Sequence, residues 1–147
     1  MAPRILADPQ ARKVYAMERC ELRGHLRHRV SMRVLRAAAR RVCIETGVPQ
    51  VQVYSKRTRG CGGEYTYPDR IDLNPSVGRN FMSLAHELAH HVAWIKSPHS
   101  HAHGPTWVWW YARIMDAMRL VPFEGTLAIC RRHGVAIAPV GAVKRPT

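Results

Sequence analysis

The sequence predicts an α+β fold, in which a small antiparallel or mixed sheet of about three strands packs on helices around one central helix. Three short segments bounded by turn residues have strand character, at residues 51–55, 64–67 and 70–73. A longer segment, residues 77–96, is apolar over most of its surface and is therefore predicted to be a buried helix. Because short turns separate the strand segments, we expect antiparallel hairpins.

Before the sheet, the chain is predicted to form two helices. The first begins at Asp8, an acid followed by proline, which is typical of a helix start, and it runs to about Leu22. The second begins at Leu26 or Ser31 and ends at Gly47. Its apolar residues recur with the helical period on one face: Val30, Val34, Leu35, Ala38 and Val42.

The chain carries a strong positive charge, with 23 Lys and Arg against 10 Asp and Glu and a formal net charge of +13. A field of this sign attracts polyanions, so we expect non-specific contact with nucleic acid, DNA above all. Six arginines around the second predicted helix form either a phosphate-contacting surface or an ordinary solvated helix face. They are Arg27, Arg29, Arg33, Arg36, Arg40 and Arg41.

Two further helices are predicted after the central one. The first, residues 106–119, has a helix-period apolar face that we interpret as core: Trp107, Trp110, Tyr111, Ile114, Met115 and Met118. The second spans residues 124–132 and is closed by His133. Residues 135–138 are a candidate short strand, and residues 141–147 are expected to fray.

The composition also bears on location. No segment approaches the ~20 apolar residues of a membrane span, and the first residues lack the apolar core of a signal peptide. We therefore expect a cytoplasmic protein without membrane contact. The short, Arg-rich composition would suit a bacterial or phage protein. The cysteines form no C-x-x-C pair, which excludes a zinc ribbon and favours free thiols. They are Cys20, Cys43, Cys61 and Cys130.

The central predicted helix carries the motif H-E-x-x-H, from His86 to His90. On a helix, residues i and i+4 lie on one face, so these two histidines can bind the same metal ion. Glu87 is displaced around the helix, where its carboxylate can reach a water molecule bound to that ion. The arrangement predicts a Zn²⁺ site at which Glu87 takes a proton from water, as in zincins.

A catalytic zinc ion usually takes a third protein ligand. His91 points about 100° away from His90 around the helix, so we interpret it as a partly buried histidine bonded to the backbone. Ala93 and Lys96 stand where the spacing H-E-x-x-H-x-x-G-x-x-H would place its glycine and third histidine, so this spacing is absent. His103 is preferred, because it directly precedes a Gly-Pro helix start. The other candidates are His101, then His99, and His133.

These motifs together resemble the SprT-like metalloprotease domain, the family that includes Spartan. The resemblance rests on H-E-x-x-H at His86, twelve intervening residues, and then H-G-P-x-W from His103 to Trp107. The residues 71–74, Ile-Asp-Leu-Asn, also look like the short strand before the active-site helix of that family. The resemblance covers about residues 48–118.

The resemblance implies a zinc-dependent endopeptidase with a zincin-like fold. By it, His86, His90 and His103 would be the zinc ligands, and Glu87 the general base. It also implies protein substrates that are associated with DNA or crosslinked to it, in agreement with the positive charge. The chain is then expected to be a single domain over residues 1–147, with basic helices at 9–46, a catalytic core at 48–120, and a C-terminal helix and tail at 121–147.

Two alternatives stay open. One is a basic DNA-binding module with a purely structural zinc, in which His99 or His101 would be the fourth ligand. The other is a regulatory protease that cuts a single repressor-type partner. For a proteolytic mechanism, the strand at residues 64–67 is a candidate to bind substrate by strand addition. The second oxyanion donor is undecided among Tyr65, Tyr67 and Arg113.

Overall fold

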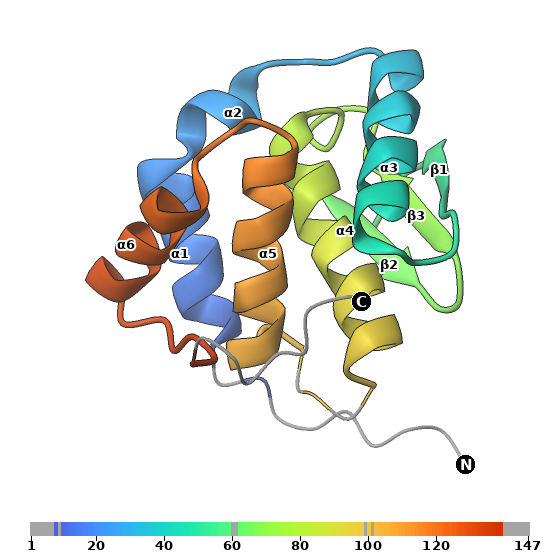
Figure 1. Cartoon of the computed structure of the whole chain (residues 1–147). Helices are drawn as coiled ribbons and strands as arrows, with labels where there is room; N and C mark the ends of the chain where they lie inside the picture. The colour runs from blue at the N-terminus through green and yellow to red at the C-terminus, as the bar shows by residue number, and fades with distance from the viewer. Residues whose placement is uncertain (1–7, 9, 60–61, 99, 101, 140–147) are drawn as a thin grey trace.

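The structure is a computed structural model that describes residues 8, 10–59, 62–98, 100 and 102–139. Within them the fold is α+β, as predicted, with six helices and one three-stranded sheet (Figure 1). The helices are α1 (Ala11–Glu21), α2 (Arg23–Arg27), α3 (Met32–Thr46), α4 (Phe81–Lys96), α5 (Pro105–Ala117) and α6 (Phe123–Arg132). The strands are β1 (Gln52–Ser55), β2 (Gly63–Thr66) and β3 (Arg70–Leu73).

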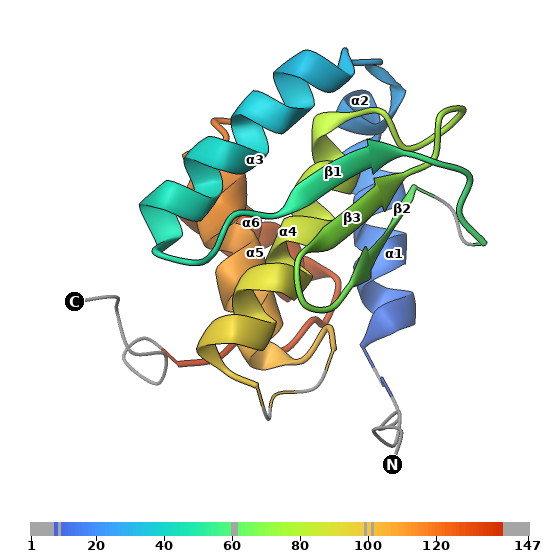
Figure 2. The same ribbon diagram turned by 90° about the vertical axis from the view of Figure 1, so that its right-hand side faces the viewer.

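The sheet is mixed, and its strand order is β1-β3-β2 (Figure 2). The predicted hairpin exists between β2 and β3, which are antiparallel. The expectation of hairpins throughout is wrong for β1, which pairs with β3 in parallel and places Val53 beside Ile71. The physical reason is burial: β3 buries three consecutive residues, Ile71, Asp72 and Leu73, and therefore takes the centre of the sheet. This order leaves β2 at one edge.

The helix α4 lies in the middle of the molecule (Figure 1). It packs against α5 on one side and against α3, β2 and β3 on the other. Eleven of its residues are buried, which confirms the prediction of a buried central helix. Its last turn differs, because Trp94 and Ile95 are 40% and 37% exposed.

The start of α4 differs from the prediction, since the helix begins at Phe81 rather than at residue 77. Asn80 is the N-cap, and its side-chain oxygen accepts a hydrogen bond from the main-chain N–H of Ser83 at 2.8 Å. The residues before it form a turn that lies against Gly62. At Gly78 an added Cβ would lie 1.7 Å from the carbonyl oxygen of Gly62, so only glycine fits there.

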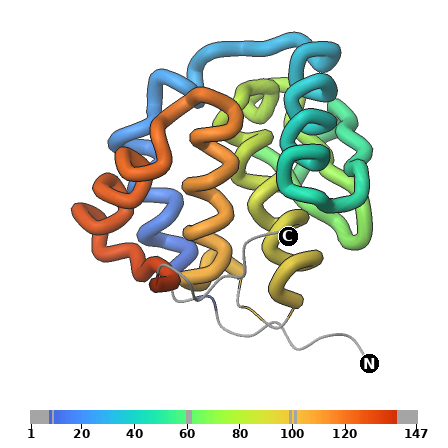
Figure 3. Tube along the Cα trace, viewed as in Figure 1, coloured from blue at the N-terminus to red at the C-terminus, as the bar shows by residue number. Residues whose placement is uncertain are grey.

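The helix α1 lies beside α6, so the first and last helices are neighbours (Figure 3). The prediction that Asp8 caps α1 is wrong: Gln10 occupies the N-cap position, and the carboxylate of Asp8 instead bonds to His103. Pro9 lies outside the described residues. The predicted strand at 135–138 is also wrong, because this segment has no strand partner among the described residues and bonds to Gln10 instead.

The other predicted boundaries differ little from the structure. Of the two starts considered for the second helix, Ser31 is confirmed, as its hydroxyl accepts a hydrogen bond from the N–H of Val34 at 3.4 Å. Gly47 ends α3 in the left-handed conformation with φ of 68°. The short α2 forms a separate element before it.

The cysteines that the structure describes are free thiols, as predicted: Cys43 and Cys130 are buried and Cys20 is exposed. Cys61 and the tail at residues 141–147 lie outside the described residues. In the described part of the chain, no helix combines the length and the apolar character needed to cross a bilayer.

The close approach at Gly78 gives a test of the packing that places α4. Gly78→Ala is expected to destabilise the protein by about 1–3 kcal/mol, because the new methyl group meets rigid backbone. Gly24→Ala is the matched control: nothing lies within 4 Å of a Cβ there, and alanine in a helix is favoured over glycine by about 1 kcal/mol. Urea denaturation of both variants makes the comparison. Equal stability of Gly78→Ala and the wild type would contradict the packing described.

Candidate metal centre

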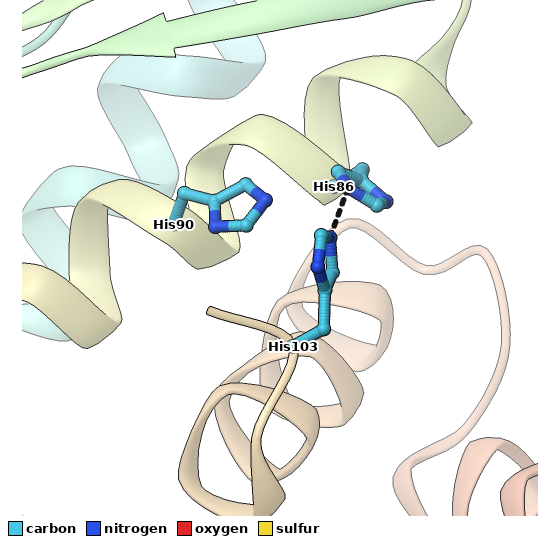
Figure 4. Close-up of side chains that lie close together, drawn as sticks. All are labelled: His86, His90 and His103. Carbon is cyan, nitrogen blue, oxygen red and sulfur yellow. Dashed lines mark hydrogen bonds between the residues drawn. The ribbon is translucent and has the colours of Figure 1, made fainter. Parts of the chain in front are cut away.

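Three histidines meet at the centre of the molecule. His86 and His90 extend from successive turns of α4, and His103 faces them from the segment that leads into α5 (Figure 4). One nitrogen from each ring can be chosen so that all three lie within 4.8 Å of one another, close enough to hold a single metal ion. His86 and His103 are buried and His90 is partly exposed. The structure therefore brings together the three residues that the sequence singled out.

His103 reaches this position through an unusual backbone conformation. Its φ is 53°, in the left-handed region that non-glycine residues rarely adopt. The side-chain amide of Gln10 donates a hydrogen bond to the carbonyl oxygen of His103 at 2.8 Å. Gly104 and Pro105 follow as the N-cap and first residue of α5. A strained residue that is held at both its carbonyl and its side chain is typical of a functional site.

Carboxylates hold two of the three imidazoles from behind. The Nδ1 atom of His86 lies 2.7 Å from Oε1 of Glu18, and Nδ1 of His103 bonds to Oδ2 of Asp8. The hydroxyl of Tyr111 also donates to Oε1 of Glu18, at 3.1 Å. Burial raises the pKa of Tyr111 well above its usual value, so the phenol stays protonated and remains a donor. The carboxylates fix the orientation of both rings, as is usual for histidines that bind metals.

The donor set fits a cation. A carboxylate can only accept, so Nδ1 of both His86 and His103 carries a proton and both Nε2 atoms present lone pairs. These two Nε2 atoms lie only 2.9 Å apart, as the dashed line in Figure 4 marks. Two lone pairs at this distance repel unless a positive charge lies between them. Three neutral imidazoles with one metal ion satisfy this requirement, and imidazole nitrogen suits zinc.

Without a metal ion, the protonation of the three rings also places a positive charge at the centre. Burial opposes a charge on His86, but the carboxylate of Glu18 outweighs it and raises the pKa of His86 to about 9. Burial and the charge on His86 lower the pKa of His90 well below its usual value. Burial and His86 also lower the pKa of His103, against the effect of Asp8. One positive charge therefore resides at the centre even when only protons are available.

Glu87 lies beside the three histidines and against the edge strand β2. A Cβ added to Gly63 would lie 3.0 Å from Cγ of Glu87, so the absence of a side chain at this strand position makes room for the glutamate. Burial raises the pKa of the Glu87 carboxyl, and the charge on His86 and the backbone N–H of Tyr65 act in the opposite direction. A carboxylate whose pKa is raised by burial accepts a proton more readily than a solvated one.

Two cavities flank the centre. The larger, of about 470 Å³, is lined by His86 and Glu87 together with residues of α1, α2 and β2. The smaller, of about 90 Å³, is lined by His90, Tyr65 and Trp107 among others. The ring of Tyr15 stacks on His86 with a centroid distance of 5.4 Å and so forms part of the wall of the larger cavity. The centre is thus accessible from two sides.

The remaining candidate ligands have other positions or are not described. His91 is fully buried, and its Nε2 bonds to the carbonyl of Pro49 at 2.8 Å, as predicted for a histidine bonded to the backbone. His133 lies 3.3 Å from Glu21, away from the metal centre. His99 and His101 lie outside the described residues.

Of the three candidate oxyanion donors, Tyr65 is the one that lines a cavity at the histidine centre. Arg113 stacks over Trp109 at 5.5 Å on the side of α6, so it takes no part in the centre. Tyr67 is 60% exposed and contacts Trp94. Tyr65 shares the smaller cavity with His90, and its hydroxyl donates to the carbonyl of Pro68 at 3.0 Å. Burial raises the pKa of Tyr65 to about 12, so it is a neutral hydroxyl at the site.

In a comparison with protein families, residues 32–133 match the SprT-like family. The chain belongs to the SprT-like family. No curated protein and no solved structure matches the chain. Membership in the SprT-like family agrees with the resemblance seen in the sequence, and it suggests metallopeptidase activity for the histidine centre.

The matched region contains the three histidines and Glu87, but it leaves out part of the centre. Asp8, Gln10, Tyr15 and Glu18 all precede residue 32, the first residue of the match. These four residues hold or cover His86 and His103. The SprT-like core of this protein is therefore completed by the N-terminal helix α1 and the residues just before it.

The sequence contained one usable signal for these missing residues. Glu18 lies four residues after Val14 and next to Met17, on the apolar stripe of α1, and all three are buried. A carboxylate on the apolar face of an amphipathic helix needs a buried partner. Asp8 gave no such signal, because an acid before proline is equally typical of a helix cap.

The link between Glu18 and His86 gives a test of the centre. Glu18→Gln keeps an oxygen that can accept but removes the charge, and we expect zinc affinity to fall roughly 10–100-fold. Glu21→Gln, on the same helix, is the control, since Glu21 bonds to Arg132 and His133 rather than to the imidazoles. Competition with a chromophoric chelator at fixed pH measures both affinities. Unchanged affinity in Glu18→Gln would show that the carboxylate does not support the metal site.

Proposed function

We propose that this SprT-like protein is a zinc-dependent endopeptidase that cleaves proteins associated with DNA or crosslinked to it. The observation that carries the proposal is the meeting of three imidazoles from α4 and the start of α5 with Glu87 beside them. In the proposal, His86, His90 and His103 bind the metal and Glu87 is the general base. The family supports metallopeptidase activity, and the zinc, the substrate and the roles of the residues are part of the proposal.

Within the described residues, three histidines and no fourth side chain form the cluster. Catalytic zinc sites typically have three protein ligands and one position for water, whereas structural sites are closed by four ligands. Three ligands are the number expected of a catalytic site; the fourth ligand of the structural alternative would be His99 or His101, which lie outside the described residues. Zinc, when bound, supplies the Lewis acid that acidifies water and polarises the carbonyl of the peptide bond.

The chain's own residues would then carry out the proton transfers. Glu87 accepts the proton of the attacking water and delivers it to the leaving nitrogen. Its burial keeps the carboxylate poorly solvated, which favours proton uptake, as the raised pKa of Glu87 reflects. Glu18 and Asp8 keep Nδ1 of their imidazoles protonated and so direct both Nε2 atoms toward the metal. Tyr65 is a candidate donor to the developing oxyanion, a role for which its hydroxyl must turn from the carbonyl of Pro68.

The edge strand β2 supports binding of an extended substrate. It pairs only with β3 among the described strands, so its other edge has no described strand partner, although the main-chain N–H of Tyr65 bonds to Glu87. Gly63 of β2 lies at Glu87 and lines the larger cavity, and Tyr65 lines the smaller cavity with His90. A peptide added to this edge passes directly over the metal centre. Main-chain hydrogen bonds provide affinity with little sequence preference, which suits a protease that acts on many proteins.

The proposed association with DNA rests on charge. The net charge is +13, and the six arginines at positions 27, 29, 33, 36, 40 and 41 are all exposed. Three of these side chains also bond to main-chain carbonyls, as Arg36 does to Val53 at 2.9 Å. Arg33 and Arg40 are seven residues apart on α3, which places them on one helix face. Such a face suits contact with phosphates without reading of base sequence.

The decisive variant for the enzymatic role is Glu87→Gln. We expect it to retain zinc and its thermal stability while turnover falls by at least about 100-fold, because the proton acceptor is lost. Wild type and variant are incubated with a DNA-binding protein as substrate, with and without single- or double-stranded DNA and with and without a chelator. Cleavage at the wild-type rate by Glu87→Gln would refute the mechanism. Bound zinc and DNA binding without any cleavage would instead indicate a DNA-binding module with a structural metal.

The arginine face of α3 gives a separate prediction. Arg33→Gln combined with Arg40→Gln is expected to weaken DNA binding for all sequences and to reduce the slope of log affinity against log salt by about two. Arg12→Gln combined with Arg131→Gln removes the same charge from α1 and α6, which lie on the far side of the molecule from α3 (Figure 1). Fluorescence anisotropy at several salt concentrations measures both. Equal loss in the two double variants would show that net charge, and not this face, binds DNA.

A further inference from the structure

The larger cavity extends the metal centre toward the N-terminal helices. It has a volume of about 470 Å³ and is continuous with His86 and Glu87 at one end. This volume lies within the range of about 300–1,000 Å³ that is usual for sites that bind small molecules or side chains. Its walls come from α1, α2, the start of α4 and the strand β2. A substrate held at the metal therefore has this cavity directly beside it.

Besides the carboxylates of Glu18 and Glu87 near the histidines, the lining of the cavity has an apolar part and a cationic part. Leu26, Val77 and Met82 provide the apolar surface. Arg19 of α1 and Arg27 of α2 also line the cavity, and both are exposed. No carboxylate of the described residues forms an ion pair with either arginine, whereas Glu18 is already engaged by His86. The cavity thus offers an apolar surface with two unneutralised positive charges near solvent.

The direction of β2 indicates which part of a substrate enters this cavity. Along β2, Gly63 lines the larger cavity and Tyr65, two residues later, lines the smaller one. The metal centre lies between them, since His86 lines the first cavity and His90 the second. Antiparallel strand pairs are more common and slightly more stable than parallel ones. A peptide that adds antiparallel to β2 therefore runs from the smaller cavity, across the metal, into the larger one.

We infer that the larger cavity is the specificity subsite for the segment that follows the cleaved bond, and that it selects a large apolar side chain followed by an acidic one. The inference rests on the proposed peptidase function. The apolar side chain contacts Leu26, Val77 and Met82, and the acidic side chain reaches Arg19 and Arg27. The subsite gives a broad protease a preference on one side of the cleaved bond only.

The test begins with digestion of an unbiased peptide library by the zinc-loaded wild type in the absence of nucleic acid, with sequencing of the products by mass spectrometry. We expect enrichment of Leu, Met or Phe directly after the cut and of Asp or Glu at the next positions. A matched pair of peptides that differ only in Asp against Lys at these positions then gives the ratio of kcat/KM. Replacing the apolar residue by Ala is expected to lower kcat/KM by about tenfold or more.

The variant that tests the cationic part is Arg19→Gln combined with Arg27→Gln. The ratio of kcat/KM for the acidic over the basic peptide is expected to fall roughly threefold to tenfold, as befits two exposed charges. Arg12→Gln combined with Arg23→Gln is the matched control, because it removes one arginine from each of the same two helices outside the cavity lining. In this control the ratio is expected to stay at the wild-type value.

The possible failures are distinguishable. Three outcomes would overturn the subsite and leave the peptidase function standing. They are cleavage with no preference after the cut, an acidic preference before the cut, and an equal loss of preference in both double variants. If the wild type does not cleave, binding of the two peptides to zinc-loaded Glu87→Gln is measured by fluorescence. Selective binding of the acidic peptide without cleavage by the wild type would overturn the proposed peptidase function and, with it, the position relative to a cleaved bond.

Discussion

The structure depends on two buried imidazoles, those of His86 and His103, whose Nε2 atoms face each other at 2.9 Å. Each ring is held from behind by a carboxylate, and this makes a positive charge between them a requirement. The surrounding helices serve this arrangement: α4 provides two rings at adjacent turns, the left-handed backbone at His103 turns the third ring inward, and α1 brings Glu18 and Tyr15.

The sheet provides none of the three clustered histidines, but its edge strand lines both cavities beside them. Because β3 is buried on both faces it takes the centre of the sheet, and β2 is left at the edge beside Glu87. Gly63 of this strand lines the larger cavity with His86, and Tyr65, two residues later, lines the smaller one with His90. An extended chain paired to β2 would therefore pass Glu87, the three histidines and both cavities. The strand β2 therefore belongs both to the sheet and to the proposed substrate-binding site.

The helix α1 contributes to the histidine centre although it precedes the residues that match the family. The SprT-like match begins at residue 32, yet the carboxylates behind His86 and His103 and the aromatic ring over them come from residues 8–18. The same helix lines the larger cavity with Tyr15 and Arg19. The partner of His86 and part of the cavity wall thus come from one N-terminal helix, which also packs against the last helix, α6.

The sequence by itself determined the local features: the α+β class, the buried helix with its histidine pair, the position of His103 before a Gly-Pro helix start, and the backbone-bonded His91. These follow from periodicity and from spacing within one helix, which act over a few residues. Only the tertiary structure decided the parallel pairing of β1 with β3, the use of Asp8 as a partner of His103, and the position of Glu18 behind His86. These contacts join residues 18 to 95 positions apart, and no local pattern specifies which distant group will satisfy a buried charge.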